Sequence, residues 1–407
     1  MEVLYPRCAG LDVHAANVVG CVRIAVGGTV TYTHRTVSTT TRGLLDLAEW
    51  LTAQGVTHVA MEATGVYWKP VWHVLEDGFT LVLANAAHIR NIPGRKSDKN
   101  DATWIADLLA LGLIRSSFVP PAPIQDLRDL TRTRKQLVRE LSRHTQRIQK
   151  TLEDANLKLT EVISDVLGQS GRAILTALVA GETDPERLIA LTRGLKASHE
   201  TLVHALHGRV TAHHRFMIQL HLTQVTALEQ AVAHLDARIG EALAPFRAAV
   251  SLLTTMPGVK TTAAAVIVAE IGVDMAVFPS AGHLLSWAGL CPRLDQSAGK
   301  RRSTRTRQSA PWLKTTLVQI AWPASRKKDS YFHAQFLRLK SRRGPKKAIL
   351  AVAATMLTDV YYMLRDGVEF HDLGDQYFAQ GDKDRITKRL LRRLRDLGVE
   401  VEVKNAA

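Results

Sequence analysis

The chain has 407 residues, of which 46% are hydrophobic, and a formal net charge of +15 from 53 Lys and Arg against 38 Asp and Glu. This length is enough for two or three domains with cores of their own. The positive excess points first to a polyanionic partner, although a membrane-surface or ribosome-like protein can be equally basic. The 3 cysteines lack paired ligand spacing, which excludes a disulfide framework and suits a reducing cytoplasm.

The sequence predicts a soluble cytoplasmic protein. Its N-terminus, MEVLYPRCAG, lacks the hydrophobic stretch of a signal peptide. The best uninterrupted apolar run, Ala348–Leu357, is too short to cross a bilayer.

Residues 1–120 show the element order of the α/β RNase H-like fold, with three antiparallel strands followed by alternating strands and helices. The strands are expected at Cys8–Val13, Val18–Ile24, Thr29–Arg35, Val56–Glu62 and Thr80–Leu83, and the helices at Thr41–Gln54 and Gly65–Asp77. A further helix begins within the stretch GRKSDKNDATW, where loop residues give way to apolar residues at helical spacing.

Four carboxylates are expected at the ends or within the strands and helices of this segment. Asp12 is expected in the middle of the first strand, Glu62 at the end of the fourth, and Asp98 and Asp101 at the start of the last helix. Side chains three residues apart lie on one helix face, so all four carboxylates are expected to converge at one edge of the sheet. Two divalent cations about 4 Å apart could then assist phosphodiester cleavage, and oxygen ligands suit Mg²⁺ or Mn²⁺.

Simpler interpretations exist for each acid. Asp98 and Asp101 could merely cap the helix and favour its dipole, and Glu62 could begin a helix. Asp12 has the weakest alternative, because an acid within an apolar strand is unfavourable unless it is paired or binds metal. Actin-like sugar kinases also begin with a strand Asp, but they need a small Gly and a hydroxyl soon after it. Here His14 and Ala15 follow Asp12-Val13, which disfavours a kinase.

Residues 121–248 predict two long helices. Apolar residues follow near-heptad spacing from Leu127 to Leu159 and again from Leu202 to Leu243. The two helices could form an antiparallel hairpin or an intermolecular coiled coil, with shorter helices of 160–199 at the tip. The basic face of the first helix could contact nucleic acid or simply be solvated.

Residues 249–370 carry two features typical of nucleic-acid contact. The stretch TMPGVKTTA resembles a helix-hairpin-helix motif, which offers backbone N–H groups to a phosphate. Lys260 replaces the usual second glycine and adds a positive charge. Further on, 9 basic residues over Arg326–Lys347 are interleaved with aromatic residues, which suits backbone contact and base stacking.

Ser297 lies in a loop of small residues between these two features. The 15 residues from Arg293 to Arg307 contain 6 Lys or Arg and a single Asp. Such a serine could be an ordinary loop residue or a nucleophile whose transition-state charge is stabilised by arginines. The candidate nucleic-acid-binding residues are Lys96, Lys99, Lys260, Arg293, Lys300, Arg301, Arg302, Arg305, Arg307, Arg342 and Arg343.

Taken together, the motifs resemble the DEDD-type insertion-sequence transposases, the bridge-RNA-guided recombinases. The matching stretches, in family order, are Gly10–His14, Glu62–Gly65, Lys96–Ala102, Pro257–Val259, Ser286–Leu290 and Phe336–Lys347.

The resemblance implies a RuvC-like domain at 1–120, in which Asp12, Glu62, Asp98 and Asp101 bind Mg²⁺ or Mn²⁺. It further implies a coiled-coil region at 121–248 and a mainly α transposase domain at 249–372. Residues 373–407 match nothing in the family, and their lysines and arginines predict a basic tail. Ser297 would be the nucleophile that attacks DNA. The partners would be donor and target DNA, a structured guide RNA and other subunits of a tetramer, in a prokaryotic cytoplasm close to the nucleoid.

The chain departs from the family pattern near the serine. Ala298 interrupts the usual Ser-Gly, and Ser309-Ala310-Pro311 replaces the common Gly-Asn. Ser303 and Ser309 are therefore alternative nucleophiles. Two other functions also remain open at this point, namely a Holliday-junction-type two-metal endonuclease without a covalent intermediate, and a non-catalytic nucleic-acid-binding protein with a decayed nuclease domain.

Overall fold

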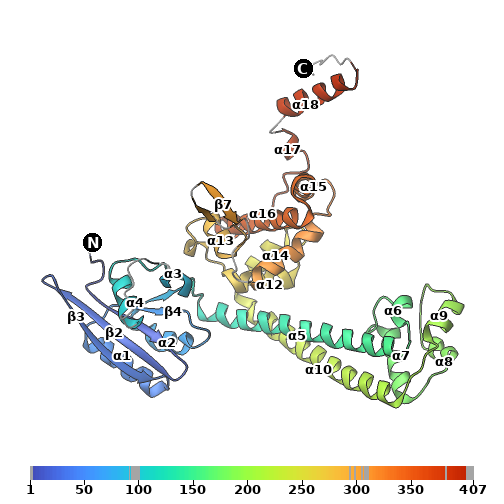
Figure 1. The fold of residues 1–407 in the computed structure, drawn as a ribbon, viewed down its shortest axis with the longest axis horizontal. Coiled ribbons are helices and arrows are strands. Elements are labelled where there is room, and N and C mark those ends of the chain that lie inside the picture. Colours follow the sequence, from blue (N-terminus) through green and yellow to red (C-terminus); the bar gives the residue numbers. More distant parts are fainter. Residues whose placement is uncertain are drawn as a thin grey trace. The chain divides into compact units, whose positions relative to one another are not determined.

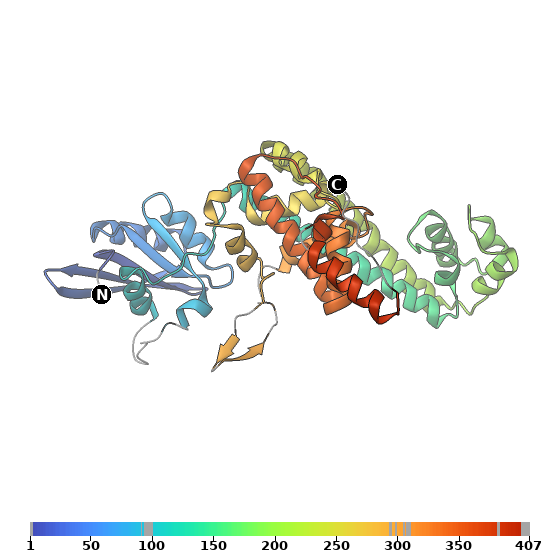
Figure 2. The same ribbon diagram turned by 90° about the horizontal axis from the view of Figure 1, so that it is seen from above.

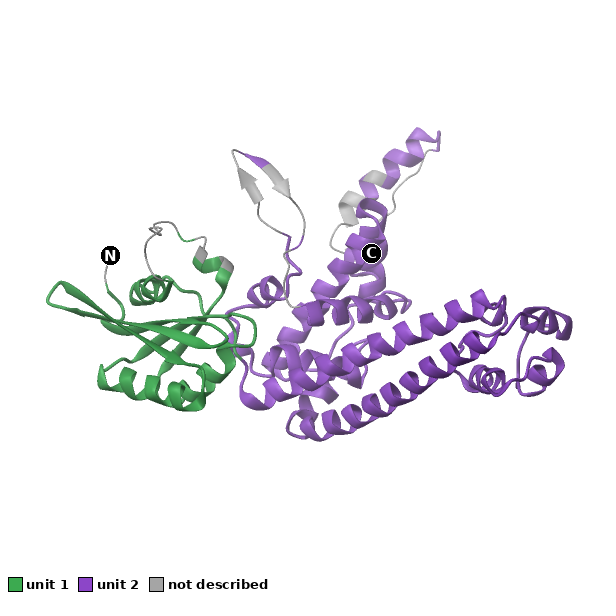
Figure 3. Cartoon of the chain, turned by 60° about the horizontal axis from the view of Figure 1, so that its bottom comes forward, with its two compact units in different colours: residues 1–119 green, residues 120–407 purple. Residues whose placement is uncertain are grey.

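The fold was analysed in a computed structural model that describes residues 3–90, 92, 101–292, 295–297, 299–303, 306, 311–380 and 383–399. The chain divides into two compact units, residues 1–119 and 120–407 (Figure 3). The further division of the second unit at residues 248 and 372 stays a prediction.

The first unit is built on a five-stranded sheet with the order β3-β2-β1-β4-β5 (Figure 1). β1 pairs antiparallel with β2, and β2 with β3, whereas β1, β4 and β5 run parallel. The strands are β1 (Arg7–Val13), β2 (Asn17–Val26), β3 (Thr29–Ser38), β4 (His58–Glu62) and β5 (Thr80–Ala84). This mixed topology is compatible with the predicted RNase H-like fold.

Helices cover both faces of the sheet because β1 and β4 alternate apolar residues toward each side. One face packs its buried Leu11 and Met61 against α1 (Thr41–Ala53) and α2 (Trp68–Leu75). The other face packs Cys8 and Ala60 against α4 (Asp101–Ala110) and the short α3 (Ala86–Arg90).

One sequence prediction about this sheet was wrong. Asp12 was expected in the middle of the first strand, but β1 ends at Val13, so Asp12 is the second-to-last residue of the strand. The chain turns directly afterwards, where the amide of His14 donates to the carbonyl of Asn17 at 2.9 Å. Asp12 therefore lies at the carboxyl edge of the sheet.

The second unit begins with two long antiparallel helices, α5 (Ala122–Asp154) and α10 (Ala212–Ala242), which lie side by side (Figure 2). Arg134 of α5 contacts Asp236 of α10, whereas Asp154 contacts His214, which establishes the opposite directions. Of the two predicted arrangements, the hairpin within one chain is the one present here. At its tip lie α6 (Leu159–Val162), α7 (Gln169–Ala180), α8 (Pro185–Ala190) and α9 (His199–Leu206).

The second long helix is shorter than predicted. Its apolar stripe was expected to run from Leu202, but α9 ends at Leu206 and α10 begins only at Ala212, after a Thr211 cap. The cap forms because the Thr211 side chain accepts a hydrogen bond from the His214 amide, while the His214 ring accepts one from the Thr211 amide.

The rest of the second unit packs around α16 (Pro345–Asp366), which contacts α11, α13, α14 and α15. By length and composition α16 could cross a membrane, but half of its apolar window is buried in the protein, as in the core helix of a soluble protein. The other elements are η1 (Ala244–Phe246), α11 (Arg247–Thr254), α12 (Thr261–Ile271), η2 (Met275–Val277), α13 (Ala281–Trp287), β6 (Asp295–Ser297), β7 (Lys300–Ser303), α14 (Pro311–Ala324), α15 (Tyr331–Arg343), α17 (Tyr377–Gln380) and α18 (Lys383–Asp396).

Candidate functional site

Asp12 and Glu62 lie on neighbouring parallel strands at the same edge of the sheet. Leu11 of β1 is paired with Met61 of β4, so the two acids, one residue further on, lie at the same level. Side chains two residues apart point to the same face of a strand. Asp12 and Glu62 therefore share the face that Cys8 and Ala60 present to α4.

Asp101 begins the helix that covers this face. A Cβ added to Gly10 would lie 2.2 Å from the Ala102 carbonyl oxygen, so the first turn of α4 lies directly on β1. The other end of α4 lies near the start of β1, because the Leu4 amide donates to the Ala110 carbonyl at 2.8 Å. α4 thus runs back along β1 and brings Asp101 to the edge that carries Asp12 and Glu62. Asp98 lies outside the described residues.

Short contacts order the ends of β1 and β4. The Thr64 hydroxyl lies 3.2 Å from both the Val13 and the Glu62 carbonyl oxygens, which ties the turn after β4 to the end of β1. The Asp12 carboxylate is 3.2 Å from His14 Nε2 and 23% exposed. Across the described residues, no group of three or more His, Cys, Asp or Glu side chains is arranged to hold a metal ion.

A polar network that sequence reasoning missed holds α4 on the sheet. Arg23 Nε donates to the Asp107 carboxylate at 3.1 Å, and the Tyr32 hydroxyl donates to the same oxygen at 2.7 Å. His34 contacts the Thr103 hydroxyl at 2.8 Å. Burial, followed by the hydrogen bond to Asp107, raises the pKa of Tyr32. The sequence does contain a signal for this network. Arg23 lies in an apolar strand and Asp107 in an apolar helix, and such charged side chains need partners when they are buried.

The predicted nucleophile lies in a hairpin rather than in a loop. Ser297 is the last residue of β6 and is paired with Lys300 of β7, so the sequence prediction of an irregular loop was wrong here. The tight turn between the two strands includes Gly299, whose φ of +74° is a backbone conformation that glycine adopts readily. The side chains of Ser297 and Ser303 are outside the described part of the structure, as is Ser309.

Lys314 anchors the base of this hairpin. Its ammonium group donates to the Gly289 carbonyl at 3.1 Å and to the Thr306 hydroxyl at 2.7 Å. Pro292 and Thr306 are joined by an isolated antiparallel bridge at the same place. Burial lowers the pKa of Lys314. Lys314 is therefore a positioning residue for the segment that carries Ser297.

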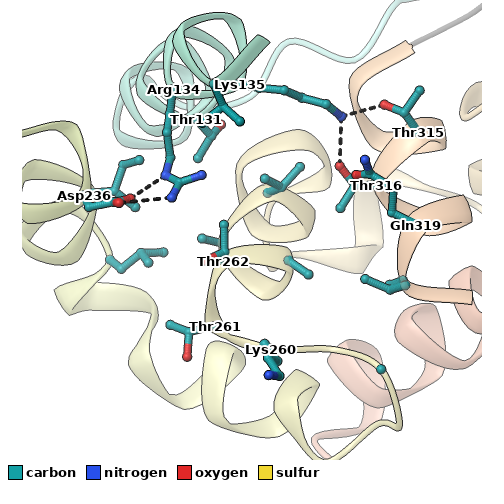
Figure 4. Close-up of a pocket in the computed structure, with 18 of the residues that line it drawn as sticks. Thr131, Arg134, Lys135, Asp236, Lys260, Thr261, Thr262, Thr315, Thr316 and Gln319 are labelled. Carbon is teal, nitrogen blue, oxygen red and sulfur yellow. Dashed lines mark hydrogen bonds and ion pairs between the residues drawn. The ribbon is translucent and has the colours of Figure 1, made fainter. Parts of the chain in front are cut away.

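A cavity of about 910 Å³ lies between α5, α10, α12 and α14 in the second unit (Figure 4). Lys260, Thr261 and Thr262 bring the start of α12 to its wall, and no side chain caps this helix end. Lys135 crosses from α5 to donate to the hydroxyls of Thr315 and Thr316 at 2.6 and 3.3 Å (Figure 4).

A turn joins α11 and α12 at the place where the sequence predicts a helix-hairpin-helix motif. Gly258 has φ +85°, and a Cβ there would lie 2.5 Å from the Ile320 carbonyl oxygen of α14. The glycine therefore serves close packing between the turn and α14. A phosphate at this place could be bound by the uncapped N–H groups at the start of α12 and by the exposed Lys260.

Two protein-family models match this chain. The model of a DEDD-type transposase of the IS110 kind matches residues 9–157, and that of the transposase IS116/IS110/IS902 family matches residues 250–337. The chain belongs to this transposase family. The first match contains all four predicted carboxylates, and the second contains Lys260 and Ser297.

Two curated proteins are similar to part of this transposase-family chain. An uncharacterised 43.6 kDa protein of insertion element IS110 from Streptomyces coelicolor is 33% identical over 152 residues, which cover 36% of each chain. An uncharacterised 42 kDa protein of insertion element IS900 from Mycobacterium paratuberculosis is 31% identical over 156 residues, 36% of this chain and 37% of that one. The similarity therefore spans little more than a third of these relatives.

The predicted basic residues are only partly described. Lys260, Lys300, Arg342 and Arg343 are exposed, and the two arginines end α15, where positive charge favours the helix dipole. The side chains of the other candidates are outside the described residues, namely Lys96, Lys99, Arg293, Arg301, Arg302, Arg305 and Arg307.

Proposed function

We propose that this protein is the transposase of an insertion element, an enzyme that cuts and rejoins DNA strands. What supports the proposal is that Asp12 and Glu62 lie level with each other on paired strands, on the sheet face covered by the helix that begins at Asp101. Family membership and the net charge of +15 support a polyanionic DNA substrate.

Asp12, Glu62, Asp98 and Asp101 would hold Mg²⁺ or Mn²⁺. A donor set of carboxylates without thiolates fits a hard divalent cation. When bound, the metal would supply charge stabilisation at the reacting phosphate. The chain itself orders the ligands, because the Thr64 hydroxyl ties the two strand ends together and the Arg23–Asp107 ion pair keeps α4 on the sheet.

Ser297 would act as the nucleophile. Its Oγ would form a bond to a DNA phosphorus while the bond to a deoxyribose oxygen breaks, which leaves a phosphoserine link to one DNA end and a hydroxyl on the other. The neighbouring Lys and Arg residues would stabilise the charge of the transition state. Following the family resemblance, a structured RNA would select donor and target DNA, and a tetramer would bring the carboxylates and the serine together from different subunits.

A denaturant-resistant protein–DNA adduct tests this function. Wild type, Ser297→Ala, Ser303→Ala and Ser309→Ala would be incubated with flanking element DNA, RNA transcribed from that element and Mg²⁺, then separated under denaturing conditions. We expect an adduct that only Ser297→Ala abolishes. An adduct lost only in Ser303→Ala or Ser309→Ala would move the nucleophile to that position. Nicked DNA without any adduct would instead establish the water-attacking two-metal endonuclease, and no cleavage at all would contradict the enzyme.

A further inference from the structure

A second cavity of about 610 Å³ lies where α14 ends and α15 begins. Trp322 lines it from the last turn of α14, Ser325, Arg326 and Lys328 from the turn that follows, and His333 and Phe336 from α15. The lining thus combines aromatic rings with two positive charges, a pattern that the catalytic proposal does not use.

The tryptophan is held in place but open to solvent. Trp322 is 37% exposed, although its ring packs edge-on against Phe336, with ring centroids 5.8 Å apart and planes at 65°. Phe336 is itself 9% exposed and belongs to the core, whereas Leu337 beside it is 49% exposed. A large ring whose position is set by a buried neighbour forms a rigid platform for stacking.

Two exposed positive charges lie beside this ring. Arg326 and Lys328 are exposed, and neither forms an ion pair with a described residue, whereas Lys327 between them contacts Asp372 at 3.4 Å. Two lysine or arginine side chains that remain available next to an aromatic platform suit a phosphate attached to a flat ring.

The cavity also offers hydrogen-bonding groups. His333 Nδ1 lies 2.7 Å from the Ser325 carbonyl oxygen, and because a carbonyl only accepts, Nδ1 carries the hydrogen. In the neutral ring, Nε2 is then an acceptor. Asp329 and Asp375 also line the cavity and would repel a phosphate placed on their side, but they could accept hydrogen bonds from the N–H groups of a base.

We propose that this cavity binds one unpaired nucleotide, with its base stacked on Trp322 and its phosphate held by Arg326 and Lys328. The site rests on the proposed function, since it deepens how the protein would handle nucleic acid. It requires a single strand, because base faces in a duplex are covered by their neighbours and cannot stack on a protein ring. The chemistry is shared by DNA and RNA strands.

Photocrosslinking tests the proposal directly. The full-length protein would be irradiated with short single-stranded DNA and RNA carrying 5-iodouracil, and crosslinked peptides would be mapped by mass spectrometry. We expect crosslinks at Trp322 or its cavity neighbours. The oligonucleotide that crosslinks more identifies the strand as DNA or RNA. Crosslinks that map only to other parts of the chain would overturn the site.

Affinity measurements with matched variants complete the test. Trp322→Leu should weaken single-strand binding by about 5- to 150-fold, the range of one lost base stack, while Trp322→Phe keeps most of it. Phe216→Leu is the control, because Phe216 is an aromatic residue of α10 that is 64% exposed and outside the cavity. Equal single-strand affinity of Trp322→Leu and wild type would overturn the proposal.

Two further measurements separate possible failures. If Trp322→Leu lowers the melting temperature, Arg326→Ser with Lys328→Ser replaces it, because both side chains are exposed and away from the core. Wild-type binding to duplex element ends is measured in parallel. If the wild type binds duplex DNA and the variants keep the wild-type affinity for single strands, the nucleotide site alone is rejected. If the wild type binds neither duplex nor single strand, the proposed function is rejected as well.

Discussion

Arg132 of α5 pairs with the fully buried carboxylate of Glu270 near the end of α12. Its Nε donates to one carboxylate oxygen and an Nη to the other, each at 2.8 Å. Arg128, one turn earlier on α5, donates to the backbone carbonyls of Ala269 and Glu270 at 3.1 and 2.7 Å. Because a buried carboxylate is unfavourable without partners, these contacts fix how α12 sits on α5, beside the larger cavity.

Arg132→Met should therefore strongly destabilise the second unit. It leaves a buried charge that Arg128, at 3.9 Å, only partly compensates. We expect a loss of about 3 kcal/mol in the free energy of unfolding, measured by urea denaturation. The double variant with Glu270→Leu should recover most of it. Arg238→Met removes an exposed pair with Glu241 and should change stability by less than about 1 kcal/mol. Equal effects of the two single variants would contradict the buried-charge argument.

Gly10→Ala should separate α4 from β1. The new Cβ would meet backbone atoms of Ala102 and Ala106 at 2.2 and 2.4 Å, and a backbone cannot move aside as a flexible side chain can. We expect a loss of about 1–3 kcal/mol in stability, together with weaker DNA cleavage because Asp101 moves with the helix.

Gly78→Ala is the matched control for this change. A Cβ at Gly78 meets nothing within 4 Å. Calorimetric melting of both variants decides the outcome. If Gly10→Ala and Gly78→Ala melt at the same temperature, the close approach of α4 to β1 does not require a glycine at position 10.

Asp12→Asn and Asp101→Asn should each lower DNA cleavage at least about a hundredfold if the carboxylates bind metal. Stability should change by no more than about 1 kcal/mol, since Asp101 also favours the dipole of α4. Mn²⁺ should raise the melting temperature of wild type but not of these variants. Asp77→Asn, an exposed acid of the same unit, is the control. An unchanged Mn²⁺ response in Asp101→Asn would remove Asp101 from the metal site.

Asp359 on α16 should make stability depend on pH. Burial raises its pKa from 3.8 to about 7. Below about pH 4 the carboxyl is protonated in both states and has no effect. Between about pH 4 and pH 7 the unfolded chain ionises first, so the folded state loses relative stability, and the loss stays constant above pH 7.

Asp359→Asn removes this loss. Each pKa unit corresponds to about 1.4 kcal/mol, so the variant should be more stable than wild type by a few kcal/mol at pH 8 and nearly equal to it at pH 4. Urea denaturation at both pH values measures the difference. A stabilisation that is the same at pH 4 and pH 8 would show that the carboxyl group does not titrate between them.

Local sequence patterns determined the elements of this protein. Apolar runs, alternation and turn residues predicted all five strands of the first unit, and helical spacing predicted α1, α5 and α10, because these patterns depend only on neighbours a few residues away. The same patterns placed Asp12 and Glu62 on strands and Asp101 at a helix start. They placed Asp12 in the middle of its strand, whereas the paired strand leaves only Val13 after it.

Only the tertiary structure decided how these elements meet. The parallel pairing of β1 with β4 brings Asp12 level with Glu62 although the residues are far apart in the chain. Arg132 and Glu270 are separated by 138 residues, and no local pattern pairs them. Likewise, no local pattern distinguishes the aromatic residues of 322–336 from one another, yet packing buries Phe332 completely and leaves Trp322 partly exposed to solvent. Register and burial result from contacts between distant segments, and these contacts decide which residues can meet a ligand.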